Sequence, residues 1–193
     1  MKGSEQGGGN MKKARMTTDV FNKLIEATKG FAQKSGSKPI HNYIRLEFHS
    51  DDDEVVAVAV DGYKMSVEHG VCNSEEDFAV YVKSNIKLPR KTEVEIELDE
   101  NEAVFRCDGF MFGYRQPEGE FLNWAGVLPE KEPTFRIGFN GNYLLKALEA
   151  ARISVGGTYK TPVVLEFRTP LDPVIIRTNK HDIKMVLPIR LRD

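Results

Sequence analysis

The chain has 193 residues, of which 40% are hydrophobic and 29% charged, a composition that suits one globular domain or one and a half. Its 27 basic and 29 acidic residues give a net charge of −2, whereas proteins that grip DNA tightly usually carry a clear basic excess. This balance excludes a strongly basic nucleic-acid binder. It leaves two possibilities, a protein without a DNA partner or one that touches DNA loosely through a local basic face.

Cys72 and Cys107 lie far apart and lack the spacing of a metal site, which is typical of free thiols in a reducing compartment. No apolar run approaches the roughly 20 residues that span a bilayer, and the Gly-rich N-terminus lacks the apolar stretch of a signal peptide. We therefore expect a cytoplasmic protein. Residues 1–15, which end in a small basic cluster, are expected to form a flexible leader.

The first structured segment is expected to open with a helix and to continue with strands. Residues 17–19 form a good N-cap region, and Phe21, Leu24 and Ile25 follow at helical spacing. The three aspartates at 51–53 indicate a solvated hairpin turn rather than a metal site, because adjacent side chains in a turn point in different directions. The expected strands are 43–48, 55–60 and 63–67.

The middle segment, residues 77–129, is expected to consist almost entirely of strands. Residues 92–98 alternate between polar and apolar side chains, which predicts a half-buried strand with one acidic face. Only residues 83–88 have room for a helical turn, and Pro89 would end it. The expected strands are 78–82, 94–98, 103–106 and 110–114.

The last segment begins at Pro133 and again combines one helix with strands. Residues 140–142 are expected to cap the helix, and an apolar stripe of Tyr143, Leu144, Ala147, Leu148 and Ala151 follows. Strands are expected over 134–139, 163–168, 174–177 and 184–191.

The first and last segments repeat one another. Residues 23–27 match 146–150, residues 46–48 match 165–167, and residues 64–65 match 184–185, at offsets of 123, 119 and 120. Three collinear matches at nearly constant offset indicate duplication. Each unit is a strand, a helix and three strands. Such a unit leaves sheet edges and an apolar helix face uncovered, so it must pack against another copy or a partner.

In four stretches, residues 58–67, 118–129, 171–174 and 185–191, the chain resembles the bacterial DNA polymerase III β subunit, or sliding clamp, family. Residues 58–67, which read V-A-V-D-G-Y-K-M-S-V, are similar to its A-T-D-G-H-R-L-A-V segment. Residues 118–129, which read E-G-E-F-L-N-W-A-G-V-L-P, are similar to its D-G-R-F-P-D-Y-R-R-V-L-P segment, and 185–191 are similar to its terminal V-V-M-P-M-R-L. Leu171–Val174 also resembles the turn ahead of the family's penultimate strand.

The resemblance implies an α+β, sliding-clamp (DNA clamp) fold of repeated β-α-β-β-β half-domains with curved antiparallel sheets. A family subunit has three domains of two half-domains each, whereas this chain has three half-domains. We expect a clamp-like domain over 16–130, whose second half nearly lacks its helix, and a C-terminal half-domain over 131–193. Uncovered half-domain edges predict a homo-oligomer built by sheet extension.

The resemblance also implies a hydrophobic cleft that holds a short peptide from polymerases or repair proteins. An apolar groove with a few polar groups at its rim is suited to the Leu and Phe anchors of such a peptide. The same apolar strand residues are alternatively plain core residues. Leu122 replaces a proline of the family, and Ala125 and Gly126 replace an arginine pair. The residues that match the walls are Tyr63, Met65, Leu122, Trp124, Val127, Val186, Leu187 and Ile189, with Arg190 nearby.

Helices of the family face DNA with basic side chains, which implies weak, non-specific contacts with double-stranded DNA phosphates. Ordinary exposed charges on amphipathic helices are the alternative, and Glu26 and Glu149 on the same helices dilute the positive charge. The matching residues are Lys23, Lys29, Lys34, Lys146 and Arg152.

No pattern in the sequence indicates catalysis. The four histidines lack metal-ligand spacing, and nucleophile-elbow, P-loop and dinucleotide motifs do not occur. We therefore expect no catalytic residue, metal or cofactor. The leading hypothesis is a processivity clamp for DNA replication. The alternatives are a non-encircling adaptor or decoy that binds clamp-motif peptides, such as one serving a phage or mobile element, and an unrelated α+β enzyme.

Overall fold

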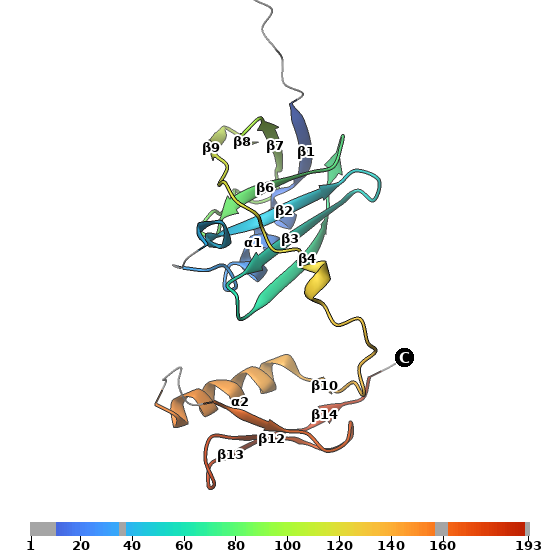
Figure 1. Ribbon diagram of the computed structural model, residues 1–193, viewed down its shortest axis with the longest axis vertical. Helices are drawn as coiled ribbons and strands as arrows, with labels where there is room; N and C mark the ends of the chain where they lie inside the picture. Colours follow the sequence, from blue (N-terminus) through green and yellow to red (C-terminus); the bar gives the residue numbers. More distant parts are fainter. Residues whose placement is uncertain (1–10, 35–37, 157–161, 192–193) are drawn as a thin grey trace, which may run out of the picture. The chain divides into compact units, whose positions relative to one another are not determined.

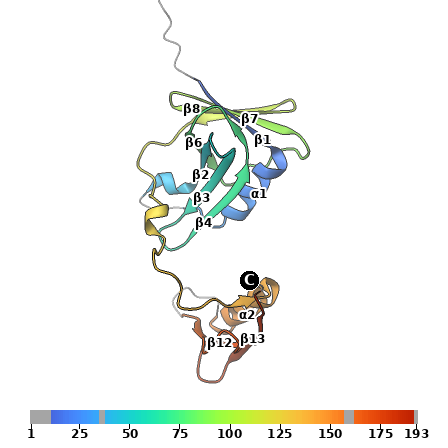
Figure 2. The same cartoon turned by 90° about the vertical axis from the view of Figure 1, so that its right-hand side faces the viewer.

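The computed structural model describes residues 11–34, 38–156 and 162–191, and the chain divides into two compact units, Met1–Val127 and Leu128–Asp193. Figures 1 and 2 show the first unit as β-sheets with a helix packed against them, and the second as a small sheet with a helix on one face. Among the described residues, neither helix has the length and apolar character that a membrane crossing requires.

The first half-domain has the order strand, helix, three strands that the sequence predicts. Helix α1 begins where the Thr17 side chain accepts a hydrogen bond from the Val20 amide, and it buries residues spaced three and four apart, from Phe21 to Thr28. The elements are β1 (Lys12–Thr17), α1 (Thr18–Thr28), β2 (Tyr43–His49), β3 (Glu54–Val60) and β4 (Met65–Val71), with a short helix at Pro39–Asn42 and a short strand β5 at Asn73–Ser74.

The second half-domain has four strands and, among its residues 78–115, no helix. Residues 84–91 run as a loop where the other half-domains have their helix, and Leu88 of this loop is buried in the main core. The strands are β6 (Phe78–Lys83), β7 (Glu93–Asp99), β8 (Glu102–Cys107) and β9 (Phe110–Arg115). Pro89 in the loop and the shortness of the segment explain why only one turn could form there.

The two half-domains exchange strands. The first sheet has the order β4-β3-β2-β6, so that β6 of the second half-domain lies beside β2 of the first. The second sheet has the order β5-β1-β7-β8-β9, so that β1 of the first half-domain lies beside β7 of the second. Helix α1 lies against β3 and β4 on one side, and Phe21 packs edge-on against Phe105 of the second sheet on the other.

The exchange corrects one sequence-based expectation. Lys12–Arg15, which we expected to belong to a flexible leader, form most of β1, and residues 1–10 of that leader lie outside the described residues. Ala14 and Met16 are buried while Arg15 is exposed, so this short strand alternates as a sheet with one covered face requires. The basic side chains of β1 concealed this alternation in the sequence.

The second unit contains the third half-domain. Asn140 accepts hydrogen bonds from the amides of Asn142 and Tyr143 and so caps its helix. The helix packs on a three-stranded sheet, and the small core consists of Ala151, Val174, Ile176 and Val186. The elements are β10 (Gly138–Phe139), α2 (Gly141–Ser154), β11 (Val164–Glu166), β12 (Val174–Arg177), β13 (Ile183–Val186) and β14 (Pro188–Ile189).

Two strands of this unit are shorter than the sequence predicts. The expected strand over 134–139 is limited to Gly138–Phe139, and the one over 163–168 to Val164–Glu166. In the first half-domain the equivalent strands, β1 and β2, have six and seven residues and are paired on both edges. Among the described residues β10 and β11 are each paired on one edge only, so fewer hydrogen bonds define them.

Candidate functional site

Three of the predicted cleft residues meet on one face of the first sheet. Met65, Leu122 and Trp124 pack against a cluster that contains Val58 and Phe121. The neighbouring residues of β3, such as Ala57, face the main core on the other side, since side chains alternate along a strand. Both faces of β3 are therefore covered, one by α1 and the other by the chain segment that carries Trp124.

A polar network holds this segment against the sheet. The Trp124 indole N–H donates to Glu47 at 3.1 Å, and the Arg45 Nε lies 2.8 Å from the other oxygen of that carboxylate. The Arg45 guanidinium lies 5.6 Å from the centre of the Phe121 ring, within the range of a cation–π contact. Together with Tyr81 and residues 119–125, these side chains line a groove of about 590 Å³.

The His41 ring packs against the Phe121 ring next to this network. The two rings meet edge-on with centroids 5.6 Å apart, and the imidazole is buried. Burial, aided by the charge of Lys38, lowers the pKa of His41, so the ring is neutral at physiological pH. Its Nε2 atom has no hydrogen-bond partner among the described residues.

The remaining predicted wall residues of the first unit are exposed. Tyr63 is 99% exposed at the tip of the turn between β3 and β4, and Val127 is 54% exposed. The turn is fixed by Asp61, whose carboxylate accepts hydrogen bonds from the amides of Tyr63 and Lys64. These bonds also lower the pKa of Asp61, although slight burial opposes them. The phenol is thus presented on a turn that is held by side-chain hydrogen bonds.

The wall residues predicted in the second unit separate into two groups. Leu187, Ile189 and Arg190 are exposed at its C-terminal strand, where they are available for contact. Val186 is only 4% exposed and packs in the core of the unit against Val174 and Ile176, so it does not line a surface there. Val186 belongs to the core because its side chain lies on the face of β13 that α2 covers.

The basic residues predicted to face DNA are exposed, but they are not all free. Lys29 forms an ion pair with Glu26 at 2.7 Å, whereas Lys23 makes no ion pair with any described residue and lines a groove between α1 and the loop at residues 84–91. Lys34 follows α1, and Lys146 and Arg152 project from α2. Sequence reasoning missed Lys87 and Arg90, which line the same groove as Lys23 and Lys29.

Sequence reasoning also missed Arg45, Glu47 and Tyr81. The signal was present in the alternation of Arg45, Glu47 and His49 along β2, which places three polar side chains on the face that Trp124 covers. Their importance depends on the return of residues 119–125 to that face, which no local pattern predicts.

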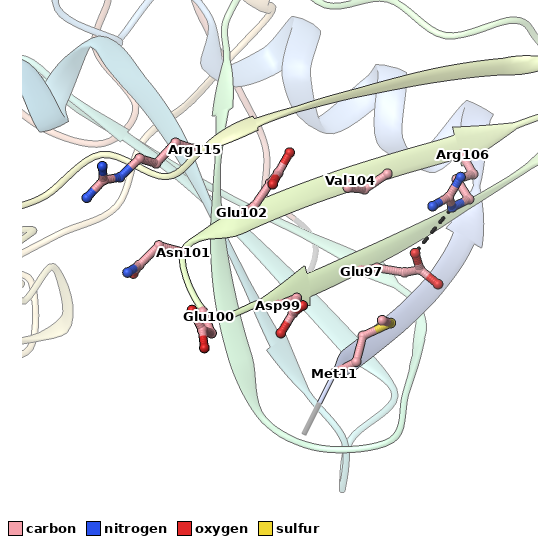
Figure 3. A pocket seen from close by; sticks show the side chains of 9 residues that line it. All are labelled: Met11, Glu97, Asp99, Glu100, Asn101, Glu102, Val104, Arg106 and Arg115. Atoms are coloured by element: carbon pink, nitrogen blue, oxygen red, sulfur yellow. Dashed lines mark hydrogen bonds and ion pairs between the residues drawn. The ribbon is translucent and has the colours of Figure 1, made fainter. Parts of the chain in front are cut away.

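The exposed face of the second sheet has a different character. Figure 3 shows an acidic groove at the turn between β7 and β8, where Asp99, Glu100 and Glu102 lie together. In the same view Glu97 and Arg106 point toward one another across the two strands, 3.2 Å apart. Lys13 of β1 approaches Glu97 from the other side at 3.1 Å.

Many solved structures share this fold, among them those of three bacterial proteins. The β subunit of DNA polymerase from Streptococcus pyogenes matches 98% of the chain at 20% identity with a TM-score of 0.76. A putative DNA polymerase III β subunit from Eubacterium rectale matches 96% at 16% identity with a TM-score of 0.81. The DNA polymerase sliding clamp of Bacillus subtilis matches 97% at 16% identity with a TM-score of 0.78.

The matches cover 52%, 52% and 51% of those three proteins, so the chain spans about half their length. No family model and no curated protein matches the sequence. At such low identity the likeness concerns the fold, and the antiparallel sheets with half-domain repeats agree with it. The chain therefore has the α+β sliding-clamp fold of bacterial DNA polymerase III β subunits.

Proposed function

We propose that this protein is a clamp-like processivity factor that tethers a DNA polymerase or repair protein to DNA. The cluster of Met65, Leu122 and Trp124 carries the proposal, because it presents apolar side chains next to a polar network on the face where the sequence predicts a peptide cleft. In this proposal the first unit, from β1 to Val127, forms the clamp-like domain, and the second unit is the additional half-domain. It assigns no catalytic role to any residue.

In this proposal the cleft captures a linear peptide with Leu or Phe anchors. Met65, Leu122 and Trp124 form its floor, and Tyr63 and Val127 supply exposed apolar surface. Leu187, Ile189 and Arg190, which are exposed in the second unit, are separate candidates for contact with a peptide. Anchors of this kind gain most of their binding energy from a few well-packed contacts. The Trp124–Glu47 hydrogen bond keeps the indole in one orientation before a peptide arrives.

Contact with DNA is proposed to be loose. Lys23, Lys29 and Lys34 in the first unit and Lys146 and Arg152 in the second would meet phosphates without reading sequence. The pairing of Lys29 with Glu26 and the net charge of −2 both favour weak attraction. A tether that encloses DNA needs little binding energy, so a weak field suits it.

Two measurements test this function. A clamp-like tether is expected to remain on nicked circular DNA and to leave it when the circle is linearised, because only topology retains it. It is also expected to bind a Gln-x-x-Leu-Phe-type peptide. Equal retention on both DNA forms, or none on either, would contradict encirclement.

A second candidate function is a non-encircling adaptor that binds clamp-motif peptides. The acidic surface around Asp99, Glu100 and Glu102 favours it, since such a surface repels phosphates. An adaptor would bind the peptide without being retained on circular DNA.

A further inference from the structure

Within the part of the chain that the structure describes, the second unit is a half-domain without a counterpart. Its helix has the same register as α1, because the N-caps Thr17 and Asn140 are separated by 123 residues, the offset of the sequence repeat. Its sheet has the order β11-β12-β13, which corresponds to β2-β3-β4. Even the cross-strand pairs agree, since Leu46 lies opposite Ala57 and Leu165 lies opposite Ile176.

Two edges that are covered in the first unit are open in the second. In the first unit β7 covers the outer edge of β1, and β6 covers the outer edge of β2. The corresponding edges of β10 and β11 have no strand beside them within the described residues. The side chains around these edges are apolar and exposed, as Phe135, Leu165 and Phe167 are between 38% and 46% exposed. Open apolar edges of this kind recruit another strand.

The first unit shows which strand fits there. Its two half-domains are related by a reciprocal exchange in which the first strand of each pairs with the second strand of the other. Thr17 at the end of β1 lies opposite Glu93 at the start of β7, and Lys83 at the end of β6 lies opposite Tyr43 at the start of β2. This exchange is an approximate two-fold relation, and two identical half-domains can form it with true two-fold symmetry.

We propose that the second unit is completed by the same unit of a second copy of this chain. Strand β10 of one copy pairs with the partner's β11, and β11 pairs with the partner's β10. The assembly is a two-fold dimer in which the two copies share one composite domain. This proposal rests on the fold and not on the tethering role, so either can fail alone.

The register of the shared sheet follows from the equivalent positions. Counting from the two N-caps, Ile137 takes the place of Ala14 and Arg136 that of Lys13. Ala14 lies opposite Ile96, and Lys13 lies opposite Glu97. The repeat places Leu165 at the position of Ile96 and Glu166 at the position of Glu97. Ile137 is therefore expected opposite the partner's Leu165, and Arg136 opposite the partner's Glu166.

Charge complementarity supports this register. In the first unit Glu97 is held on one side by Arg106 of its own half-domain, at 3.2 Å, and on the other by Lys13 of its counterpart, at 3.1 Å. In the second unit Glu166 is held by Arg177 of its own half-domain at 2.8 Å, with the same diagonal placement. The side chain of Arg168 reaches its other oxygen at 3.5 Å.

The partner of Glu166 that would correspond to Lys13 has to come from the counterpart half-domain. Arg136 of the second copy is the residue at that position. Its side chain is 75% exposed and lies 3.9 Å from Glu132, so it is available for a stronger partner. A basic residue opposite Glu166 and apolar residues on either side of it reproduce the pattern of the first unit. A second copy is therefore the occupant that fits both the symmetry and the charge.

An exposed residue of helix α2 also indicates that the partner is a second copy of this chain. Asn22 of α1 faces the loop that replaces a helix in the second half-domain, and the repeat places Leu145 at that position of α2. Leu145 is exposed, and a second α2 related by the two-fold axis would cover it. Asn22, which is polar, faces a loop, whereas Leu145, which is apolar, is expected to face a helix.

The test measures the mass of the full chain by analytical ultracentrifugation over a range of concentrations. We expect a dimer that Arg136→Glu weakens on the order of tenfold or more, because each copy contributes one reversed charge to two pairs. Lys180→Glu makes the same change of charge in the exposed turn between β12 and β13 and is expected to leave the dimer unchanged. A chain that stays monomeric at all concentrations would overturn the proposal.

A cross-linking experiment tests the register and does not depend on the strength of the dimer. Directly opposite residues of antiparallel strands lie about 4.5–5.5 Å apart, a distance that a disulfide spans. The variant with Arg136→Cys and Glu166→Cys is expected to give a covalent dimer on mild oxidation, whereas Arg136→Cys with Arg168→Cys, two residues out of register, is not. A dimer that neither forms this cross-link nor responds to Arg136→Glu uses another surface and refutes the model.

Discussion

Asn22 and Leu88 are joined by hydrogen bonds in both directions. The Asn22 side chain donates to the Leu88 carbonyl at 2.9 Å and accepts from the Leu88 amide at 2.8 Å. One side chain thereby satisfies both backbone groups of a buried residue in a loop that has no secondary structure of its own. This pair explains how the second half-domain keeps a closed core without a helix.

Asn22→Ala is therefore expected to destabilise the first unit by about 1–3 kcal/mol, because two buried backbone groups lose their partner. Chemical denaturation followed by near-ultraviolet circular dichroism measures the change. Asn85→Ala alters an exposed asparagine of the same loop and should cost little. Equal effects of the two substitutions on the free energy of unfolding would show that the Asn22–Leu88 hydrogen bonds do not stabilise the first unit.

Met65→Asp is expected to abolish binding of a Gln-x-x-Leu-Phe-type peptide, because a carboxylate would lie on the apolar floor of the cleft. Met65 is half-buried, so much of the fold should remain. Leu187→Asp, at an exposed position of the second unit, is expected to act in the same way.

Fluorescence anisotropy of a labelled peptide measures both variants. Met111→Asp places the same charge on β9, where the methionine is exposed, and should bind as the unaltered chain does. If Met65→Asp unfolds the protein, Met65 is a core residue and its assignment to the cleft is wrong, and peptide binding that Leu187→Asp leaves unchanged would remove Leu187 from the cleft.

Lys23→Ala is expected to reduce the salt dependence of DNA binding. Each phosphate contact contributes about 0.9 to the slope of log affinity against log salt, so the slope should fall by roughly one. Lys29→Ala should have a smaller effect because Lys29 is paired with Glu26. Binding titrations at several salt concentrations decide this, with Lys12→Ala on β1 as the control, and an unchanged slope would remove α1 from the DNA-facing surface.

Glu97 gives the first unit a defined acid sensitivity. Burial opposes its ionisation, but hydrogen bonds and charges from Lys13 and Arg106 outweigh burial and lower the pKa of Glu97. A lowered pKa in the folded state contributes stability above the ordinary value of about 4.3, and that stability is lost as the pH falls through the lowered pKa.

Glu97→Gln should therefore lower the urea midpoint at pH 7, and its difference from the unaltered chain should shrink at pH values below about 4. Glu102→Gln, an exposed neighbour in the same groove, serves as the control. A difference that stays constant down to pH 2 would mean that ionisation of Glu97 is not the cause.

Local patterns predicted the elements of the first unit well. The alternation in β2 and β7, the cap at Thr17 and the repeat at an offset of about 120 residues all depend on neighbours in sequence. The half-domain order and the missing second helix followed from them. The pairing of β1 with β7 joins residues about 80 positions apart, so only the tertiary fold reveals that Lys12–Arg15 are structured.

The candidate site was predictable in part for the same reason. Trp124 and Met65 were found through a resemblance, whereas Glu47 and Arg45 were not, because their roles depend on a segment that returns 77 residues later. Val186 shows the opposite error. Its neighbours in the motif are exposed, but the alternation of β13 turns its side chain into the core.

The loop that stands in for a helix leaves these 193 residues with three half-domains, and three is an odd number. Two half-domains complete each other's sheets, as the pairing of β1 with β7 and of β6 with β2 shows. Within the described residues the third half-domain therefore has no counterpart, and a second copy of the same residues would supply one. Two copies of these residues would together hold three complete domains, each with both of its half-domains.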